Sequence, residues 1–214
     1  MKTTILTIVI AFLNVTGFSQ SAQFQQKMGE VLQQYAKCQS IEDYQQSANQ
    51  FKMISNVEKA EWLPLYYNAH AYIIMSFMSQ EGADKKDALL SEAEVSIKKM
   101  LELVPNEVEA IALNAFYYTA KLVVDPMNRG QEYSMLFGQT IGKALAMDPK
   151  NPRARYMKLA NDIGSAGFFG KDPAEYKGAA ESLLADWDSY KIKSPIHPNW
   201  GKSYVDGLVK QVSK

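Results

Sequence analysis

Two segments of this chain match each other at a spacing of 44 residues. Each pair of matched positions carries the same residue type, and the pairs are Ile97 and Ile141, Lys99 and Lys143, Leu101 and Leu145, Pro105 and Pro149, and Ala110 and Ala154. A fixed spacing of this size is typical of a helical hairpin that recurs along a chain. Because one hairpin cannot bury its apolar face alone, neighbouring copies must stack. The repeat therefore predicts an all-α fold of stacked antiparallel helical hairpins.

Helical periodicity extends through the rest of the chain. Apolar residues recur three and four positions apart, and strictly alternating β-branched runs are absent from the sequence. The pattern predicts about nine helices, over residues 24–37, 42–54, 60–79, 84–104, 107–123, 132–146, 152–164, 174–190 and a short last helix that ends at 212. Between them we expect a turn-rich break at 125–130 and a glycine-rich loop at 164–170.

The positions around this repeat resemble the tetratricopeptide repeat (TPR) family. The second helix of that motif carries a small residue, a larger apolar residue, another small residue and a closing proline at fixed spacings. The first copy here is Ala93, Ile97, Met100 and Pro105, the second is Phe137, Ile141, Ala144 and Pro149, and a weaker third is Ala180, Leu184 and Trp187. Positions of the first helix are matched by Trp62 and Leu65, and then by Ile111, Ala115 and Tyr118. The resemblance covers about residues 62–190 and implies TPR-like stacking, as in secreted TPR-like proteins of Gram-negative bacteria.

The period departs from that of the family. TPR units repeat every 34 residues or so, roughly ten fewer than the period in this chain. We expect the extra residues to lengthen the helices and their connections, above all at 79–87 and 125–132. Phe137 also stands where the family has a small residue. The resemblance therefore implies stacked hairpins without implying a regular superhelix.

The N-terminus has the three parts of a secretory signal peptide. Lys2 supplies a positive charge, residues 5–18 are mostly apolar, and Gly17 and Ser19 are the small residues before a cleavage site. The apolar stretch is shorter than the roughly 20 residues that cross a bilayer, which argues against a membrane anchor. We expect cleavage between Ser19 and Gln20 and a periplasmic or secreted protein.

The composition limits the classes of partner. The formal net charge is +0 and the sequence has no basic cluster, which argues against nucleic acid and against an anionic membrane surface as partners. Cys38 is the single cysteine, so no intramolecular disulfide can form and core packing alone must hold the fold together. The length fits one domain. We expect this domain at 20–214, with no membrane span after processing and with 191–214 as a C-terminal cap that packs Trp200 on the last hairpin.

Catalytic and metal-binding motifs are absent from the sequence. The two histidines, His70 and His197, lie far apart, and no zinc, nucleophile-elbow or phosphate-loop motif occurs. The glycines at 164, 167 and 170 follow a helix instead of a strand, which favours a helix end and turn over a phosphate loop. The sequence therefore predicts no catalytic residue, no metal site and no cofactor.

Several side chains fall on one face when the first helices of successive hairpins are aligned. The predicted residues for a ligand or partner are Tyr67, His70, Glu109, Phe116, Thr119, Arg153 and Tyr156. Aromatic rings supply contact area and a few charged groups fix orientation, as in sites for an extended peptide or a small organic ligand. The alternative is that these rings are ordinary packing residues between layers.

Three functions are compatible with these features. The leading hypothesis is a non-enzymatic exported binding or scaffold protein that uses a concave aromatic face for a protein or peptide. The alternative is a small-molecule-binding accessory of a transport system, which a closed cavity around Tyr67, His70 and Phe116 would favour over an open groove. An enzyme would require His70 to lie within hydrogen-bond distance of a carboxylate such as Glu109.

Overall fold

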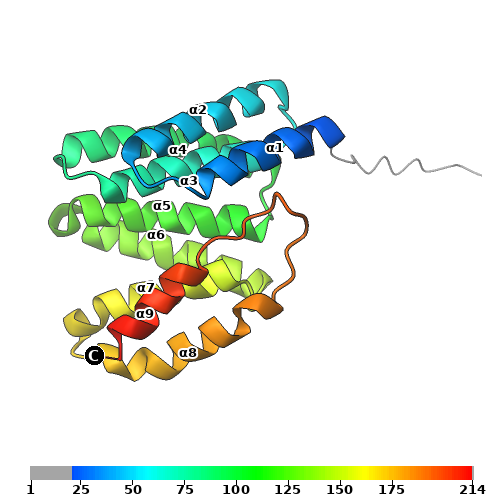
Figure 1. The fold of residues 1–214 in the computed structure, drawn as a ribbon. Helices are drawn as coiled ribbons and strands as arrows, with labels where there is room; N and C mark the ends of the chain where they lie inside the picture. The colour runs from blue at the N-terminus through cyan, green and yellow to red at the C-terminus, as the bar shows by residue number, and fades with distance from the viewer. Residues whose placement is uncertain (1–20, 214) are drawn as a thin grey trace, which may run out of the picture.

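The computed structural model describes residues 21–213, and over that range the chain is helical without a strand (Figure 1). The helices are α1 (Ala22–Tyr35), α2 (Ile41–Val57), α3 (Leu63–Met78), α4 (Ala83–Leu103), α5 (Val108–Val124), α6 (Pro126–Met147), α7 (Pro152–Ser165), α8 (Lys177–Asp186) and α9 (Lys202–Gln211), with short 3-10 turns η1 (Ala166–Phe169), η2 (Pro173–Tyr176) and η3 (Trp187–Ser189). The all-α prediction and its nine helices are confirmed for this part of the chain. The signal peptide predicted at 1–19 lies outside the described residues.

The helices stack as successive hairpins. Each helix packs against the next one along the chain, and α3 also packs on α5, and α5 on α7. Figure 1 shows the resulting tiers, which run from α1 and α2 at one end of the molecule to α8 and α9 at the other. The first helices of three successive hairpins therefore lie side by side. None of the helices between residues 21 and 213 has the length and apolar character that a membrane span needs.

Two of the five matched pairs of the repeat are core positions. Ile97 of α4 and Ile141 of α6 are buried, and so are Ala110 of α5 and Ala154 of α7. The alanines let neighbouring helices approach closely, while the isoleucines fill the space between them. A proline follows α4 and α6 two residues after each helix ends, as expected of a residue that cannot continue a helix. The 44-residue spacing thus corresponds to one hairpin step.

The connection after α5 is much shorter than predicted. Asp125 is the only residue between α5 and α6, and its side chain accepts a hydrogen bond from the Asn128 backbone N–H (3.2 Å). Pro126 takes the first helical position, where a missing N–H costs little. The predicted break at 125–130 is therefore wrong, because its turn-forming residues serve as a helix cap and a first turn. The extra length of the repeat lies mainly in α4 and α6, which have 21 and 22 residues.

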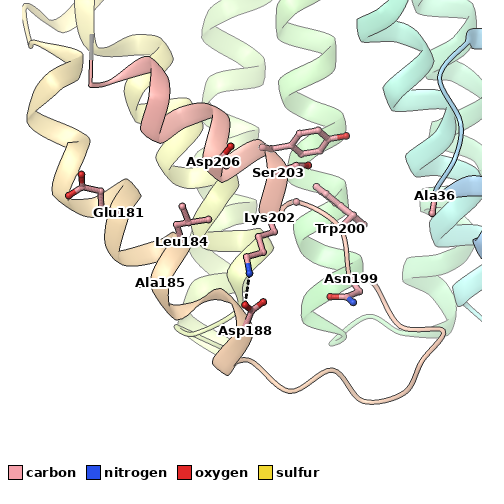
Figure 2. Close-up of a pocket in the computed structure, with 12 residues that line it drawn as sticks. Ala36, Glu181, Leu184, Ala185, Asp188, Asn199, Trp200, Lys202, Ser203 and Asp206 are labelled. Atoms are coloured by element: carbon pink, nitrogen blue, oxygen red, sulfur yellow. Dashed lines mark hydrogen bonds and ion pairs between the residues drawn. The ribbon is translucent and has the colours of Figure 1, made fainter.

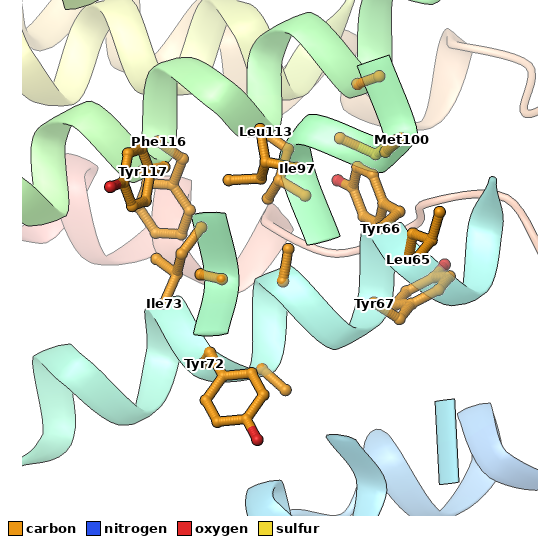
Figure 3. Close-up of a cluster of buried hydrophobic side chains, with 14 of the residues drawn as sticks. Leu65, Tyr66, Tyr67, Tyr72, Ile73, Ile97, Met100, Leu113, Phe116 and Tyr117 are labelled. Carbon is orange, nitrogen blue, oxygen red and sulfur yellow. The ribbon is translucent and has the colours of Figure 1, made fainter. Parts of the chain in front are cut away.

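Two hydrophobic clusters hold the stack together. The larger one contains residues from each of the helices α1 through α7. Among them are Tyr66, Ile97 and Leu113, which Figure 3 shows between α3 and α5. Every residue of α3 from position 63 to position 76 is buried, so this helix is the centre of the fold. The smaller cluster lies among α7, α8 and α9, around Leu183 and Val205. The C-terminal tiers therefore have a core of their own, much smaller than the first.

Residues 191–201, which we call the C-terminal strap, connect η3 to α9. The strap leaves the last hairpin, passes along the first helices of the stack and returns to α9, which packs on α8 (Figure 1). Trp200, which we expected on the last hairpin, lies instead on α3 and α5, where it contacts His70 and Phe116. Gly201 makes the turn into α9 at a φ of +113°, and a Cβ atom there would lie 2.8 Å from the Trp187 ring.

Candidate functional site

The seven residues predicted as a binding face come from adjacent helices, and we call them the inner face. Tyr67 and His70 lie on α3, Glu109, Phe116 and Thr119 on α5, and Arg153 and Tyr156 on α7. The structure buries all but two of them, since Thr119 and Tyr156 are half-buried. Sequence alignment of the hairpins thus placed these side chains correctly on neighbouring helices, but it did not indicate that most of them are inaccessible to solvent.

The C-terminal strap covers the inner face. Tyr67 Oη donates a hydrogen bond to the Ile196 carbonyl (3.2 Å), and Trp200 Nε1 donates one to Tyr66 Oη (2.9 Å). The Trp200 ring lies against the His70 ring, with 4.3 Å between their centroids. The strap therefore fills the position that an extended peptide would take in an open concave groove.

Glu109 and Arg153 form a buried ion pair where α5 meets α7. Arg153 Nε donates to Glu109 Oε2 (2.6 Å), and Arg153 Nη2 donates to Oε1. Asn151 Nδ2 also donates to Glu109 Oε1 (2.6 Å). Buried charges are tolerated when they are paired and hydrogen-bonded in this way. Both charges are thus satisfied within the protein, and they join one hairpin to the next.

His70 is the polar side chain of the inner face that is least satisfied. Its Nδ1 lies 2.5 Å from Tyr35 Oη, whereas its Nε2 is buried without a hydrogen-bond partner among the described residues. Burial lowers the pKa of His70 to about 3, so the imidazole is neutral at physiological pH. Since Glu109 is bonded to Arg153 and Asn151, His70 and Glu109 do not form the acid–base pair that an enzyme would require.

A cleft of about 1100 Å³ opens beside the strap, bordered by α8, α9 and the residue that follows α1 (Figure 2). Residues that line it include Ala36, Leu184, Ala185, Trp200, Ser203 and Tyr204. Ligand pockets commonly measure roughly 300–1,000 Å³, so this cleft has room for a large organic molecule. Trp200, Tyr204 and Leu184 give it a wall that is aromatic and apolar.

The charged groups at the cleft are balanced. Its three carboxylates each have a lysine partner: Asp188 pairs with Lys202, Glu181 with Lys177 (4.0 Å) and Asp206 with Lys210 (2.5 Å). Figure 2 shows the Lys202–Asp188 pair at the edge of the cleft. Exposed pairs of this kind contribute little to stability, so breaking one costs little. Lys202 itself lines the cleft and is therefore available to an acidic group of a ligand.

Sequence reasoning missed the residues of the cleft. Among the described residues, none of the seven predicted ones lines it, although Tyr156 contacts Tyr204 with 5.8 Å between ring centroids. Trp200 and Tyr204 lie four positions apart near the start of the last helix, and this spacing was visible in the sequence. The alignment of hairpins passed over them because they follow the last repeat.

Comparison with known proteins gives a likeness of fold. No family model matches this chain, and no curated protein matches it. A solved structure that does match is the HusA haemophore from Porphyromonas gingivalis, with a TM-score of 0.77, 24% sequence identity, and coverage of 91% of this chain and 94% of that chain. A fold can host more than one function, so the site must carry the functional argument. The chain is thus similar, along nearly its whole length, to the fold of a haemophore.

Proposed function

We propose that this protein is an exported, non-enzymatic binding protein whose ligand is a flat ring system of the tetrapyrrole class, to which haem belongs. The observation that carries this proposal is the large cleft with Trp200 and Tyr204 in its wall. Aromatic side chains stack on flat conjugated ligands and lose little conformational entropy in doing so. The fold likeness to a haemophore supports the same class of ligand.

The edge of the cleft suits the same ligand. Haem and its metal-free relatives carry carboxylates on one edge of an otherwise apolar ring. Lys202 lies at the cleft and pairs there with the exposed Asp188, so it can turn to a ligand carboxylate. The ring would then lie against the aromatic wall with its carboxylates directed toward solvent.

A protein or peptide at the inner face is the second candidate. It is favoured by the strap itself, an extended segment that already lies along these helices. An external peptide would have to displace the strap and break the bonds from Tyr67 to Ile196 and from Trp200 to Tyr66. Because the cleft is open without such displacement, a small molecule is the better-supported ligand.

Several sequence-based predictions remain part of this proposal. Export would depend on the signal peptide at 1–19, and the mature protein would be a single domain over 20–214 in the periplasm or outside the cell. The hairpin stacking supports a TPR-like interpretation with a lengthened repeat. A ligand captured there would be passed to a transport system, in keeping with the role of a solute-binding accessory.

Titration of the mature protein with metal-free protoporphyrin IX tests the proposal, with quenching of tryptophan fluorescence as the signal. We expect Tyr204→Ala to weaken binding about 10-fold, which corresponds to the roughly 1.4 kcal/mol that one aromatic contact contributes. Phe168→Ala is the matched control, because Phe168 is 88% exposed and does not line the cleft. Equal effects of the two substitutions would place the porphyrin elsewhere, and no binding to the wild-type protein would overturn the proposed ligand class.

A further inference from the structure

We propose that His70 is the axial ligand for the iron of a metallated tetrapyrrole that takes the place of the Trp200 indole. This inference rests on the proposed function and deepens it. A metal-free ring lies against Trp200 in the cleft, whereas a metallated ring displaces the indole, breaks its hydrogen bond to Tyr66 and gains a bond to His70, so the protein distinguishes the two rings. The relevant atom is Nε2 of the His70 ring, and this ring packs against the Trp200 ring that lines the cleft.

The first observation is the unpaired nitrogen. Within residues 21–213, His70 Nε2 is the buried side-chain nitrogen or oxygen that has no hydrogen-bond partner. His70 is only 3% exposed, so water does not readily replace the missing partner. Buried polar groups are nearly always paired, and an exception often has a functional reason. A lone pair that is free of hydrogen bonds is what coordination to a metal needs.

The second observation is the way the other ring nitrogen is held. His70 Nδ1 lies 2.5 Å from Tyr35 Oη, and the Tyr35 ring is fixed in turn by edge contacts with Phe51 and Tyr67. Histidines that bind metals usually donate their second N–H to a nearby oxygen, which sets the tautomer and the orientation of the ring. When Nδ1 donates to Tyr35, the free lone pair is on Nε2. The pKa lowered to about 3 by burial means that no proton competes for it at neutral pH.

The third observation is the position of Trp200. Its indole contacts the His70 imidazole, and the same residue lines the cleft (Figure 2). The indole also stacks on Phe116 with 5.7 Å between centroids. A flat ligand that replaced the indole would find the same aromatic neighbours and would bring its centre close to His70. Gly201, in its positive-φ turn directly after Trp200, is the natural point about which the strap would move.

A metallated ring fits this site better than a free metal ion does. Over residues 21–213 there is no group of three or more His, Cys, Asp and Glu side chains that could hold an ion. A tetrapyrrole brings four nitrogen donors of its own, so that one histidine from the protein completes the coordination on one side. The Nε2 lone pair forms a bond to the iron, a solvent molecule leaves the iron, and no proton or electron is transferred.

The chain offers a matched control, because His197 is its second histidine. His197 lies in the strap, its Nδ1 is 2.7 Å from Ser194 Oγ, and its ring packs on Trp62. It does not line the cleft. Loss of His197 should therefore leave the coordination of a bound iron unchanged.

The experiment compares two probes, hemin and metal-free protoporphyrin IX, on the mature protein. The variants are His70→Phe, which keeps a ring in place, His70→Gln as a second replacement, His197→Phe and Tyr35→Phe. Binding constants come from absorption titrations, and nitrogen ligation of the iron is identified from the absorption and electron paramagnetic resonance spectra. Binding of the metal-free probe shows for each variant that the fold and the cleft are intact.

The expected result is a nitrogen-ligated iron spectrum in the wild type and in His197→Phe that is absent from both His70 variants. Hemin should bind the wild type at least about 10-fold more tightly than it binds His70→Phe, and Tyr35→Phe should lose affinity for hemin by a smaller factor. Metal-free protoporphyrin should bind all the variants alike.

Identical hemin spectra and affinities in the wild type and His70→Phe would overturn the role of His70 and leave the proposed tetrapyrrole site standing. A ligated spectrum that disappears in His197→Phe instead would also overturn it. Failure of both probes to bind the wild type would remove the proposed function itself, and the inference with it.

Discussion

The inner face and the cleft meet at Trp200, yet they differ in how far their charged side chains are exposed to solvent. In the ion pair of the inner face, the Arg153 and Glu109 side chains are 2% and 6% exposed, whereas Lys202 and Asp188 at the cleft are 49% and 75% exposed. The inner face is closed by the strap, and the cleft is open. An aromatic face on repeat helices is therefore not by itself a binding surface, because the chain can use the same rings to pack its own C-terminal segment.

The largest expected effect separates the two ion pairs. Glu109→Ala leaves Arg153 charged, buried and without its partner, so we expect a loss of about 3–5 kcal/mol in the free energy of unfolding. Asp188→Ala breaks the exposed pair with Lys202 and should leave stability nearly unchanged. Urea denaturation of both variants measures the difference. Similar midpoints would mean that the inner face is far more hydrated than the structure shows.

Trp200→Ala tests the side chain that the two regions share. Removal of the indole takes away its packing on His70 and Phe116 and its hydrogen bond to Tyr66, and we expect a loss of about 3 kcal/mol. Amide hydrogen exchange in the strap should accelerate, because the strap loses its main contact. Tyr204→Ala removes only an edge contact with the Trp200 ring, at 6.1 Å between centroids, and should accelerate exchange in the strap much less. Equal acceleration in both would show that the strap is held by α9 and not by the inner face.

Acid should weaken the inner face through His70. Its folded-state pKa of about 3 lies below the ordinary value of 6.5, so the unfolded chain binds a proton in this range and the folded protein does not. Stability therefore falls as the pH falls, by about 2 kcal/mol between about pH 7.5 and pH 5 from this group alone. Unfolding curves of the wild type and His70→Phe, measured across this pH range, should show that the free energy of unfolding falls more steeply with falling pH in the wild type. Parallel pH profiles would contradict the burial of a neutral imidazole.

The smallest effect concerns one hydrogen bond between the inner face and the strap. Tyr67→Phe removes the bond to the Ile196 carbonyl, and we expect a loss of about 1 kcal/mol. Tyr204→Phe is the control, since that ring belongs to the cleft and is 38% exposed. Thermal unfolding of the two variants gives the comparison. A larger loss in Tyr204→Phe would reverse the assignment of which region holds the strap.

The sequence predicted the helices well where apolar spacing is regular and failed where polar residues have two possible roles. The repeat positions Ile97 and Ile141 follow directly from spacings of three and four, whereas α3 is buried on all sides and not only along the stripe that such spacing predicts. Asp125 and Pro126 are typical both of a turn and of a helix start, and only the packing of α6 on α5 selects the second. For the candidate site, the repeat correctly grouped the seven residues on adjacent helices but could not find the cleft, whose aromatic residues Trp200 and Tyr204 follow the last repeat.

What the sequence determined by itself was the all-α class, the hairpin step and the register of the core, because these depend on contacts between residues close in the chain. What only the tertiary structure decided was the path of the strap, the burial of His70 and the existence of the cleft. The strap has no periodic pattern, and its position depends on contacts such as that between Trp200 and Tyr66, which lie 134 residues apart. Closing such a long loop costs conformational entropy, and the contacts that offset this cost form only when the whole stack has formed. No local pattern in the sequence therefore indicates the path of the strap.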